Sequence, residues 1–453
     1  MPMRHALLAI AFATAFGTAT AGPAEELKSL LEQGQPAKAY ELGKTTPDLL
    51  GNPAFDFFFG IAALDAGAPG EGVLALERFL LQAPDNRQAR FHAARGYYIL
   101  GEDVRAHGEF VALLTGAQGA EKTAIENYLD AIRARESRYT PTATFFIEAG
   151  FGHDSNINAG VRPGSVDGLP GFTVDAAGIS SKEGDGFHSL QTGVQGTYPV
   201  APGVMLTGGV QAGGRWHWSS ANDIFDQSSL QAQGGVTVLK GRNLFRAGVE
   251  YGLNWVNGAQ YLQVASLVGE WAYQANQFNR FALAVQHSQL RYEDITVFLD
   301  KGRTLSGPSG APERNSDFSV LQGTWTHAWA QPWNPVVAAT LNIGREHNIK
   351  SRPDFSRNVY GARARLSLQP APKWSIASEL SWQHSQFQDH FAGIPDFSRR
   401  RDDYVALDLA AIYAINRNWS VRAEALFANQ KSNIGLYDFN RNAVALKLRY
   451  DFR

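Results

Sequence analysis

The sequence predicts a fold of two unlike parts, a small α-helical domain followed by a transmembrane β-barrel of 14 antiparallel strands. Three observations predict it. Residues 23–138 show a helical period with an internal repeat, and residues 144–453 alternate with a period of two. After residue 25 there is no apolar stretch of about 18 residues, which excludes a membrane-spanning helix. A mean hydropathy of -0.24 with 45 glycines suits strands that show the membrane only every second side chain.

Composition excludes several classes of function. The net charge of -2 provides no positive field for nucleic acid, so no nucleic-acid partner is expected. The chain has no cysteine, which excludes disulfides, thiolate zinc sites, cysteine nucleophiles and a lipidation site of its own.

Residues 1–21 are expected to be a secretory signal peptide. Arg4 and His5 form a short polar start, residues 6–16 are apolar, and Ala19-Thr20-Ala21 is a small-residue cleavage site, so the mature chain would begin near Gly22. The alternative is a short buried helix, which the position and the flanking residues disfavour.

Residues 23–138 are predicted to form a periplasmic, tetratricopeptide-like helical domain. Gly67 and Gly101 are separated by about 34 residues, the repeat length of such units, and Gly34 precedes Gly67 at nearly the same interval. Gly60 and Ala94 take the small positions at which paired helices approach closely. The pattern predicts two good repeats, one degenerate first repeat, and a closing helix around residues 120–135.

A helical stack of this kind offers an inner face for binding a partner. We expect helix residues Phe57, Asp65, Arg95 and Tyr98 on that face, as tentative client-binding positions. The alternative is that so short a stack only plugs or stiffens the barrel.

The barrel is predicted from alternation. In the last strand Val444, Leu446 and Leu448 point one way, and Lys447 and Arg449 point the other. Aromatic residues gather near strand ends, as in an interfacial girdle. The 14 predicted strands are 144–151, 187–198, 204–216, 227–239, 244–255, 260–273, 279–291, 316–330, 335–347, 357–369, 374–387, 402–414, 419–430 and 440–452.

The connections predict an orientation. Those after even-numbered strands are tight, such as Ala201-Pro202-Gly203, whereas those after odd-numbered strands are mostly longer, notably 153–186 and 292–315. Bacterial barrels keep short turns in the periplasm and long loops outside. An even number of strands then brings both barrel ends to the periplasm, where the helical domain is expected.

Charged residues of both signs are predicted to face the lumen. They could line a wet passage or form a cross-strand ladder of salt bridges, and their mixed sign argues against an ion-selective pore. The predicted lumen residues are Arg246, Glu250, Arg363, Arg365, Glu379, Asp408, Arg422, Glu424, Lys447 and Arg449.

Catalytic chemistry is not predicted. No metal or nucleophile motif occurs, so the chain is expected to be no enzyme and to need no cofactor or metal ion. The polar segment from Asp154 to Asn158 could coordinate calcium, but turns that end the first strand are the favoured interpretation.

The whole mature chain resembles the surface lipoprotein assembly modifier (Slam) family of outer-membrane translocons. The segment Phe151-Gly152-His153-Asp154-Ser155-Asn156-Ile157-Asn158 is similar to the aspartate- and asparagine-rich segment that follows the first strand in that family. The resemblance implies export or surface display of a partner lipoprotein or secreted protein, which the helical domain would engage in the periplasm. It implies no catalytic residues.

Other functions remain open at this point. A polysaccharide exporter also couples such repeats to a barrel, but a longer repeat array would be expected. A passive porin with a helical accessory domain is the next alternative, and an outer-membrane enzyme is the last. The expected partners are the client, outer-membrane lipid and the barrel assembly machinery, which reads a terminal strand such as the one ending at Phe452; the protein is expected to be a monomer.

Overall fold

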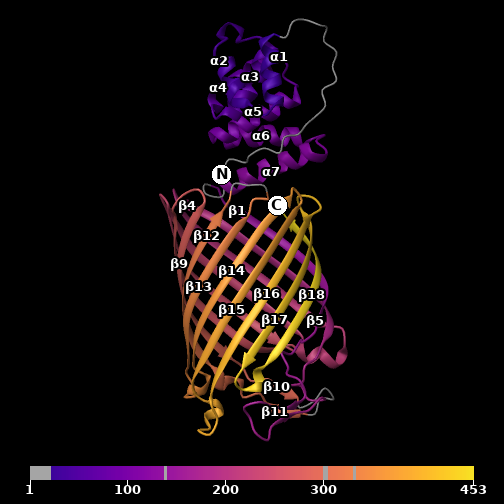
Figure 1. Cartoon of the computed structure of the whole chain (residues 1–453), viewed down its shortest axis with the longest axis vertical. Coiled ribbons are helices and arrows are strands. Elements are labelled where there is room, and N and C mark those ends of the chain that lie inside the picture. The colour runs from indigo at the N-terminus through magenta and orange to yellow at the C-terminus, as the bar shows by residue number, and fades with distance from the viewer. Residues whose placement is uncertain (1–21, 137–139, 299–304, 330–332, 453) are drawn as a thin grey trace. The chain divides into compact units, whose positions relative to one another are not determined.

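The computed structural model describes residues 22–136, 140–298, 305–329 and 333–452. The chain divides into two compact units, Met1–Tyr139 and Thr140–Arg453 (Figure 1). The predicted signal peptide (1–21), the last residues of the predicted helical domain (137–138) and Arg453 lie outside the described residues. The predicted fold class is confirmed, because a helical region is followed by a closed antiparallel barrel of 14 strands.

The helical unit repeats its geometry as well as its sequence. Helices α3 and α5 start one repeat length apart, after Asn52 and Asn86, whose side chains each accept a hydrogen bond from a backbone N–H of the first turn. Both helices end at a glycine in the left-handed conformation, Gly67 and Gly101. The helices are α1 (Pro23–Glu32), α2 (Pro36–Lys44), η1 (Pro47–Leu49), α3 (Pro53–Ala66), α4 (Pro69–Gln82), α5 (Arg87–Leu100), α6 (Asp103–Leu114) and α7 (Gly119–Glu136).

Small residues let α3 and α4 pack with their backbones close together. A Cβ atom added to Gly72 would lie 2.8 Å from the carbonyl oxygen of Gly60. Phe110, Leu113 and Ile125 are among the fully buried side chains that fill the space between successive helices. The small and aromatic positions of the repeat therefore have a direct packing role.

Ion pairs between distant positions tie the stacked helices to one another. The buried carboxylate of Asp56 on α3 accepts two hydrogen bonds from Arg78 on α4, at 2.6 and 3.0 Å, and a third from the backbone N–H of Gly51. Arg90 on α5 similarly bonds Glu109 on α6 at 2.8 Å. A carboxylate that is only 1% exposed depends on these donors, because it has lost its water.

The variant Asp56→Ala is expected to destabilise the helical unit by about 2–3 kcal/mol, because Arg78 and the Gly51 N–H lose their acceptor together. The loss of stability is measured by chemical denaturation of the full chain, with unfolding monitored by circular dichroism at the helical band. Glu41→Ala, which removes an exposed acid of α2, serves as the control. Equal unfolding midpoints for the two variants would contradict the prediction.

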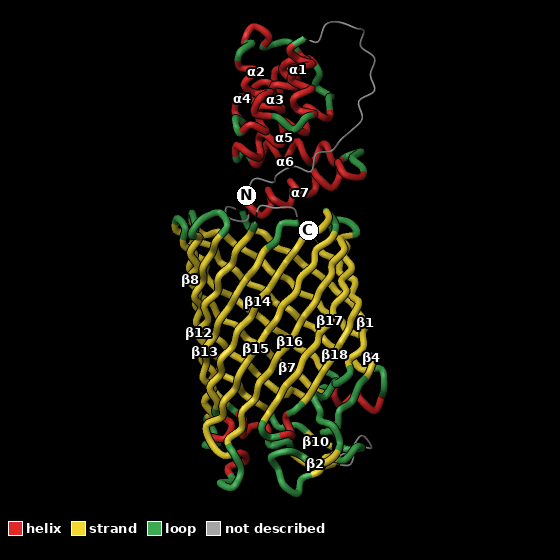
Figure 2. Tube along the Cα trace, viewed as in Figure 1, coloured by secondary structure: helices red, strands yellow, loops and turns green. Residues whose placement is uncertain are grey.

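The second unit is a closed barrel of antiparallel strands, steeply tilted in Figure 2. The barrel closes where β1 pairs with β18, and Phe145 lies opposite Phe452. The start of the first strand and the end of the last strand are therefore at the same end of the barrel. In the order of the wall, the strands are β1 (Thr142–Asp154), β18 (Phe439–Phe452), β17 (Trp419–Ser432), β16 (Arg399–Ala414), β15 (Trp374–His390), β14 (Arg357–Ala371), β13 (Val336–Asn348), β12 (Ser316–Ala328), β9 (Asn279–Tyr292), β8 (Ala259–Gln274), β7 (Asn243–Val256), β6 (Gln227–Lys240), β5 (Val204–His217) and β4 (Asp185–Ala201).

The connections are asymmetric, as predicted, with one exception. At the end where β1 begins, the turns are short, for example Pro202-Gly203 between β4 and β5. At the other end most connections are longer, but β7 and β8 join through Asn257-Gly258, both with positive φ as a tight hairpin turn needs. The longer connections carry short elements that the sequence analysis did not predict: β2 (Gly164–Ser165), β3 (Thr173–Val174), η2 (Ser220–Phe225), β10 (Thr296–Phe298), β11 (Leu305–Pro308), η3 (Ala311–Arg314), η4 (Pro353–Phe355), η5 (Phe391–Gly393) and η6 (Gly435–Tyr437).

The outer face of the barrel is apolar and carries an aromatic girdle near the short turns. Trp271 and Trp325 donate their indole N–H groups to Asn243 and Asn279 at the turns, at 3.0 and 3.1 Å. The rings of Trp419 and Tyr450 lie 4.8 Å apart on neighbouring strands. Rings with one apolar and one polar side suit a membrane boundary. Within the described ranges, no helix is long and apolar enough to cross a membrane.

Candidate functional site

The inner face of the barrel is the first candidate site. Along β1, Phe145 and Ile147 are each 41% exposed on the outer face, whereas the next residue, Glu148, points inward and is 4% exposed. The same alternation places every predicted lumen residue on the face opposite the exposed apolar side chains.

One part of this inner wall is a connected salt-bridge network. Lys447 on β18 bonds Glu424 on β17 at 2.8 Å and lies 3.5 Å from Glu148 on β1. Arg422 joins the network through Glu424 at 3.3 Å, and Arg449 pairs with Asp451 on its own strand. The pairs that Lys447 makes with Glu424 and Glu148 cross between strands at the closure of the barrel, as a ladder would, although Oε2 of Glu148 has no hydrogen-bond partner among the described residues.

Another part of the wall is open. Arg363 and Arg365 on β14 and Asp408 on β16 face inward and are exposed, and the structure gives them no ion pair within the residues it describes. Glu379 lies between them in register, opposite both Arg365 and Asp408. Glu250 on β7 is likewise exposed, whereas Arg246 pairs with Glu270 on β8 at 3.1 Å. The two interpretations of the lumen charges therefore apply to different walls, a ladder at β17, β18 and β1 and a water-accessible surface at β14–β16.

A neutral wall of amides was missed by the sequence analysis. Strands β4, β5 and β6 turn exposed glutamine side chains inward, and Gln211 and Gln231 lie directly opposite each other. Glycines such as Gly193 and Gly209 stand between them on the same face. Glutamine at every second or fourth position is the signal in the sequence that could have revealed this wall. The inward amides are Gln191, Gln195, Gln211, Gln231 and Gln233.

Reversing the charge of the two exposed lumen arginines on β14 should change the ion selectivity of the barrel. The double variant Arg363→Glu and Arg365→Glu replaces two inward cations by two anions, so the cation-to-anion permeability ratio is expected to rise at least about twofold. Reversal potentials in planar bilayers under a salt gradient measure the ratio. Arg401→Glu, which changes an exposed outward side chain on β16, is the control. An unchanged ratio in the double variant would contradict a water-filled lumen at this wall.

The polar segment after β1 fastens the first long connection to the barrel. Asp154 is fully buried and accepts hydrogen bonds from Arg441 on β18, at 2.5–3.1 Å, and from Arg215 on β5 at 3.1 Å. Asn156 is also fully buried, and its amide bonds the backbone of Gly160 and Asn440. Donors therefore occupy the oxygens that calcium would need, which supports the turn interpretation. Among the described residues no group of three His, Asp or Glu side chains could hold a metal ion.

The same connection, residues 155–184, builds a small core with two other connections. Leu169 and Ile434 are almost completely buried together, with Phe391, Phe397 and Tyr437 packed around them. The backbone N–H of Gly435 donates to the carbonyl of Asp167 at 2.7 Å. The connection therefore reaches from β1 past β18 and β17 to the segment between β15 and β16, and it is fixed there by apolar contacts as well as hydrogen bonds.

The predicted inner-face residues of the helical unit are engaged within the unit itself. Asp65 and Arg95 form an ion pair with each other, at 18% and 10% side-chain exposure. Phe57 is buried in the core, with its ring 5.2 Å from that of Phe79. Tyr98 lies under the guanidinium of Arg135, at 4.1 Å. Three of the four positions thus gather around α5, and Phe57 has a packing role.

Two buried polar atoms of α5 have no partner among the residues that the structure describes. They are Nδ1 of His92, whose ring lies 6.4 Å from that of Phe57, and Nε of Arg95. Burial, with a smaller contribution from the charge of Arg95, lowers the pKa of His92 to about 3, so the imidazole is neutral at pH 7. A neutral imidazole nitrogen can accept a hydrogen bond from an added chain, and a guanidinium N–H can donate one to it. His92 was not among the predicted residues.

The chain is weakly similar to several solved structures. No protein-family model and no curated protein matches the chain. A loop-deletion variant of OmpT, an outer membrane protein of Vibrio cholerae, matches over 69% of this chain and 100% of its own, with 11% identity and a TM-score of 0.38. A FadL homologue of Pseudomonas aeruginosa matches over 74% and 93%, with 10% identity and a TM-score of 0.36.

The helical unit is similar to a different class of structure. The type III secretion translocator chaperone SycD of Yersinia enterocolitica matches over 25% of this chain and 83% of its own, with 16% identity and a TM-score of 0.22. At such values these likenesses carry no argument about substrate. The fold itself is a helical domain followed by a closed antiparallel β-barrel.

Proposed function

We propose that this protein is an outer-membrane translocon that helps to export or display a partner lipoprotein or secreted protein, with its helical domain in the periplasm. The observation that carries the proposal is the inner wall of the barrel, which joins open charges of both signs to a row of neutral amides. A polypeptide presents both charged side chains and amide groups, so such a wall can accept many sequences without binding one tightly.

Two aromatic rings of the lumen are closed to a sugar polymer. Guanidinium groups cover both of these inward rings: Arg449 lies 3.9 Å from the centre of the Phe146 ring, and Arg215 lies 4.1 Å from that of Phe187. A covered ring offers no open face on which a sugar could stack. Phe318 on β12 and Tyr404 on β16 also face inward, so the covered rings weaken the polysaccharide exporter only at those two positions. The porin alternative differs in needing no helical domain.

In this proposal the helical domain engages the client along α5. His92 and Arg95 supply the two buried polar atoms described above. Both atoms lie beneath the surface, so the helices around α5 must separate before these atoms hydrogen-bond an extended segment of the client. The absence of any catalytic step stays a prediction, as does the need for the barrel assembly machinery.

The experiment is deletion of residues 23–138 with the signal segment and barrel retained, followed by measurement of client display on the cell surface. The candidate client is the product of a neighbouring gene, where that gene encodes an exported protein. Display is expected to fall to the level of a strain without the protein. Heat-modifiable mobility on gels controls for correct folding of the shortened barrel. Undiminished display with a folded barrel would refute the role of the helical domain.

A narrower variant separates client binding from folding. His92→Phe keeps an aromatic ring, only slightly larger than imidazole, and removes both ring nitrogens, so helical content should be preserved while display falls. Phe79→Leu, a packing change that leaves both buried polar atoms in place, is the matched control. Loss of display in both variants to the same extent would indicate a structural effect only.

A further inference from the structure

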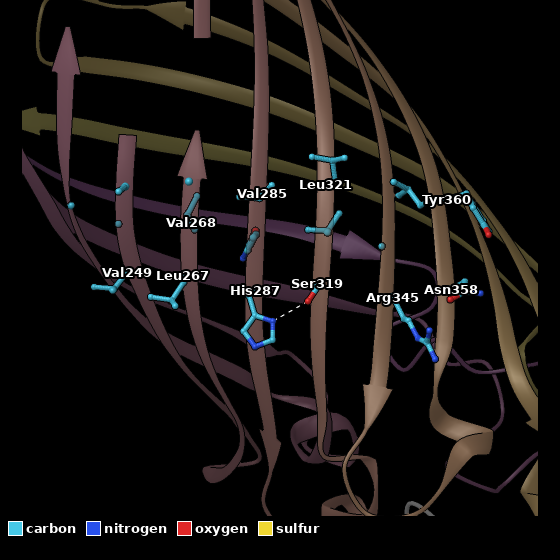
Figure 3. Close-up of a pocket in the computed structure, with 18 of the residues that line it drawn as sticks. Val249, Leu267, Val268, Val285, His287, Ser319, Leu321, Arg345, Asn358 and Tyr360 are labelled. Atoms are coloured by element: carbon cyan, nitrogen blue, oxygen red, sulfur yellow. Dashed lines mark hydrogen bonds between the residues drawn. The ribbon is translucent and has the colours of Figure 1, made fainter. Parts of the chain in front are cut away.

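A hollow of about 1080 Å³ lies on the outer face of the barrel, across β6 to β14 (Figure 3). It follows two neighbouring rows of outward residues that the strand register defines. One row runs from Val249 through Leu267 and His287 to Ser319, and the other passes through Val285 and Leu321. A second hollow of about 760 Å³ adjoins it and shares Val249 and Leu267.

The hollow exists because side chains are missing from its floor, and the backbone does not require this. A Cβ atom added to Gly269 would have only Val285 near it, at 3.4 Å, and one added to Gly234 would meet nothing closer than 4.0 Å. Neither glycine has a positive φ, so any residue could occupy these positions. The neighbouring Leu267, 62% exposed, stands as a ridge beside the floor.

The hollow changes from apolar to polar along its length. At β6 to β8 its lining is Val, Leu, Ala and Gly, whereas at β9 to β14 one register row becomes His287, Ser319, Arg345 and Asn358. Nδ1 of His287 lies 2.9 Å from the Ser319 hydroxyl oxygen. Because the strands are tilted, the row that is apolar at one end reaches the polar margin of the barrel at the other.

The positive charge at the polar end is available to an anion. The Arg345 guanidinium contacts the Gln388 side chain at 3.5 Å, and Arg345 has no ion pair among the residues that the structure describes. Two outward acids at this margin are occupied, since Asp317 pairs with Arg291 and Asp403 with His384. A cation, an imidazole and a carboxamide in one row match a phosphate group.

We propose that this hollow is a binding site for an anionic phospholipid, with an acyl chain over Gly234 and Gly269 and the phosphate at Arg345 and His287. A void on a lipid-facing surface is filled by the hydrocarbon around it, and an ordered chain gains dispersion contacts there. The row of His287, Ser319, Arg345 and Asn358 makes the site selective for lipids with an anionic head group. This site is independent of the proposed export function, because it uses outward residues only.

The test is native mass spectrometry of the full-length protein in detergent, titrated with phosphatidylglycerol or with phosphatidylcholine of the same acyl chains. Wild type should retain phosphatidylglycerol more tightly. Gly269→Leu fills the floor and should weaken both lipids, by about tenfold. Arg345→Gln should weaken phosphatidylglycerol about fivefold and leave phosphatidylcholine unchanged, since only the charged contact is lost.

Matched controls lie elsewhere on the same barrel. Ala423→Leu adds comparable bulk to an exposed outward position on β17, and Arg401→Gln removes an exposed outward arginine on β16. Both should bind as wild type does. Heat-modifiable mobility establishes that every variant is folded. Equal retention of the two lipids by wild type, or equal effects of Gly269→Leu and Ala423→Leu, would overturn the proposal.

Discussion

Replacing Asp154 by alanine is expected to free the first long connection and to lower the stability of the barrel by about 3 kcal/mol. The carboxylate is fully buried between Arg441 and Arg215, which are 28% and 35% exposed. Without it, two guanidinium groups face each other with no counter-charge, and the N–H of Asn156 loses its acceptor. The expected loss of stability lies at the low end of the range for breaking a buried ion pair, because both arginines are partly exposed and can be hydrated again.

Two measurements report this effect. The temperature at which the folded form disappears on gels should fall, and limited proteolysis should cut within residues 155–184 much earlier than in wild type. Asp175→Ala is the control, because Asp175 is an acid of the same connection whose side chain accepts a hydrogen bond from the nearby backbone N–H of Ala177. If the two variants behave alike, Asp154 does not fasten the connection.

A disulfide between positions 167 and 435 is expected to have the opposite effect. A Cβ atom added to Gly435 would lie 3.3 Å from that of Asp167, a little under the separation of about 3.5–4.5 Å in disulfides. It would also lie 2.9 Å from the backbone nitrogen of Asp167, so the two segments must move slightly apart to admit the bond. The chain contains no cysteine, so Asp167→Cys with Gly435→Cys creates a single possible pair. Because the bond would close a loop of more than about 100 residues, it should stabilise the folded state by up to about 5 kcal/mol.

The bond should form on oxidation and raise the unfolding temperature, and reductant should reverse both changes. Non-reducing gels report the bond, and thermal denaturation with and without reductant reports its effect. The single variants Asp167→Cys and Gly435→Cys show the cost of each substitution alone. Failure of the pair to oxidise in the folded barrel would mean that the connection does not rest on the β17–β18 turn.

Local pattern was sufficient for the barrel strands and the paired helices, but not for the short elements in the longer connections. Alternation along each strand reports which side chains meet lipid, and it is a property of neighbours in sequence, so the number and order of the barrel strands could be predicted. Repeat spacing likewise predicted the helix pairs, because Gly67 and Gly101 recur about one repeat length apart. The structure adds the N-caps Asn52 and Asn86, which recur at the same separation.

The functional surfaces were harder to predict from the sequence. Sequence patterns identified Asp65 and Arg95 separately, but only the folded unit pairs them and buries the imidazole of His92 beside them. The role of Asp154 was also open, since Arg441 lies 287 residues away along the chain. Contacts of this kind depend on which strands become neighbours when the barrel closes.

The sequence by itself determined the fold class, the strand count and the inward position of the polar residues, because each follows from short-range periodicity. Only the tertiary structure decided which lumen charges neutralise one another, where the first connection rests, and that an outward row of small residues leaves a hollow. These depend on register across strands, and a shift of one residue would reverse the face of every side chain without changing the sequence pattern.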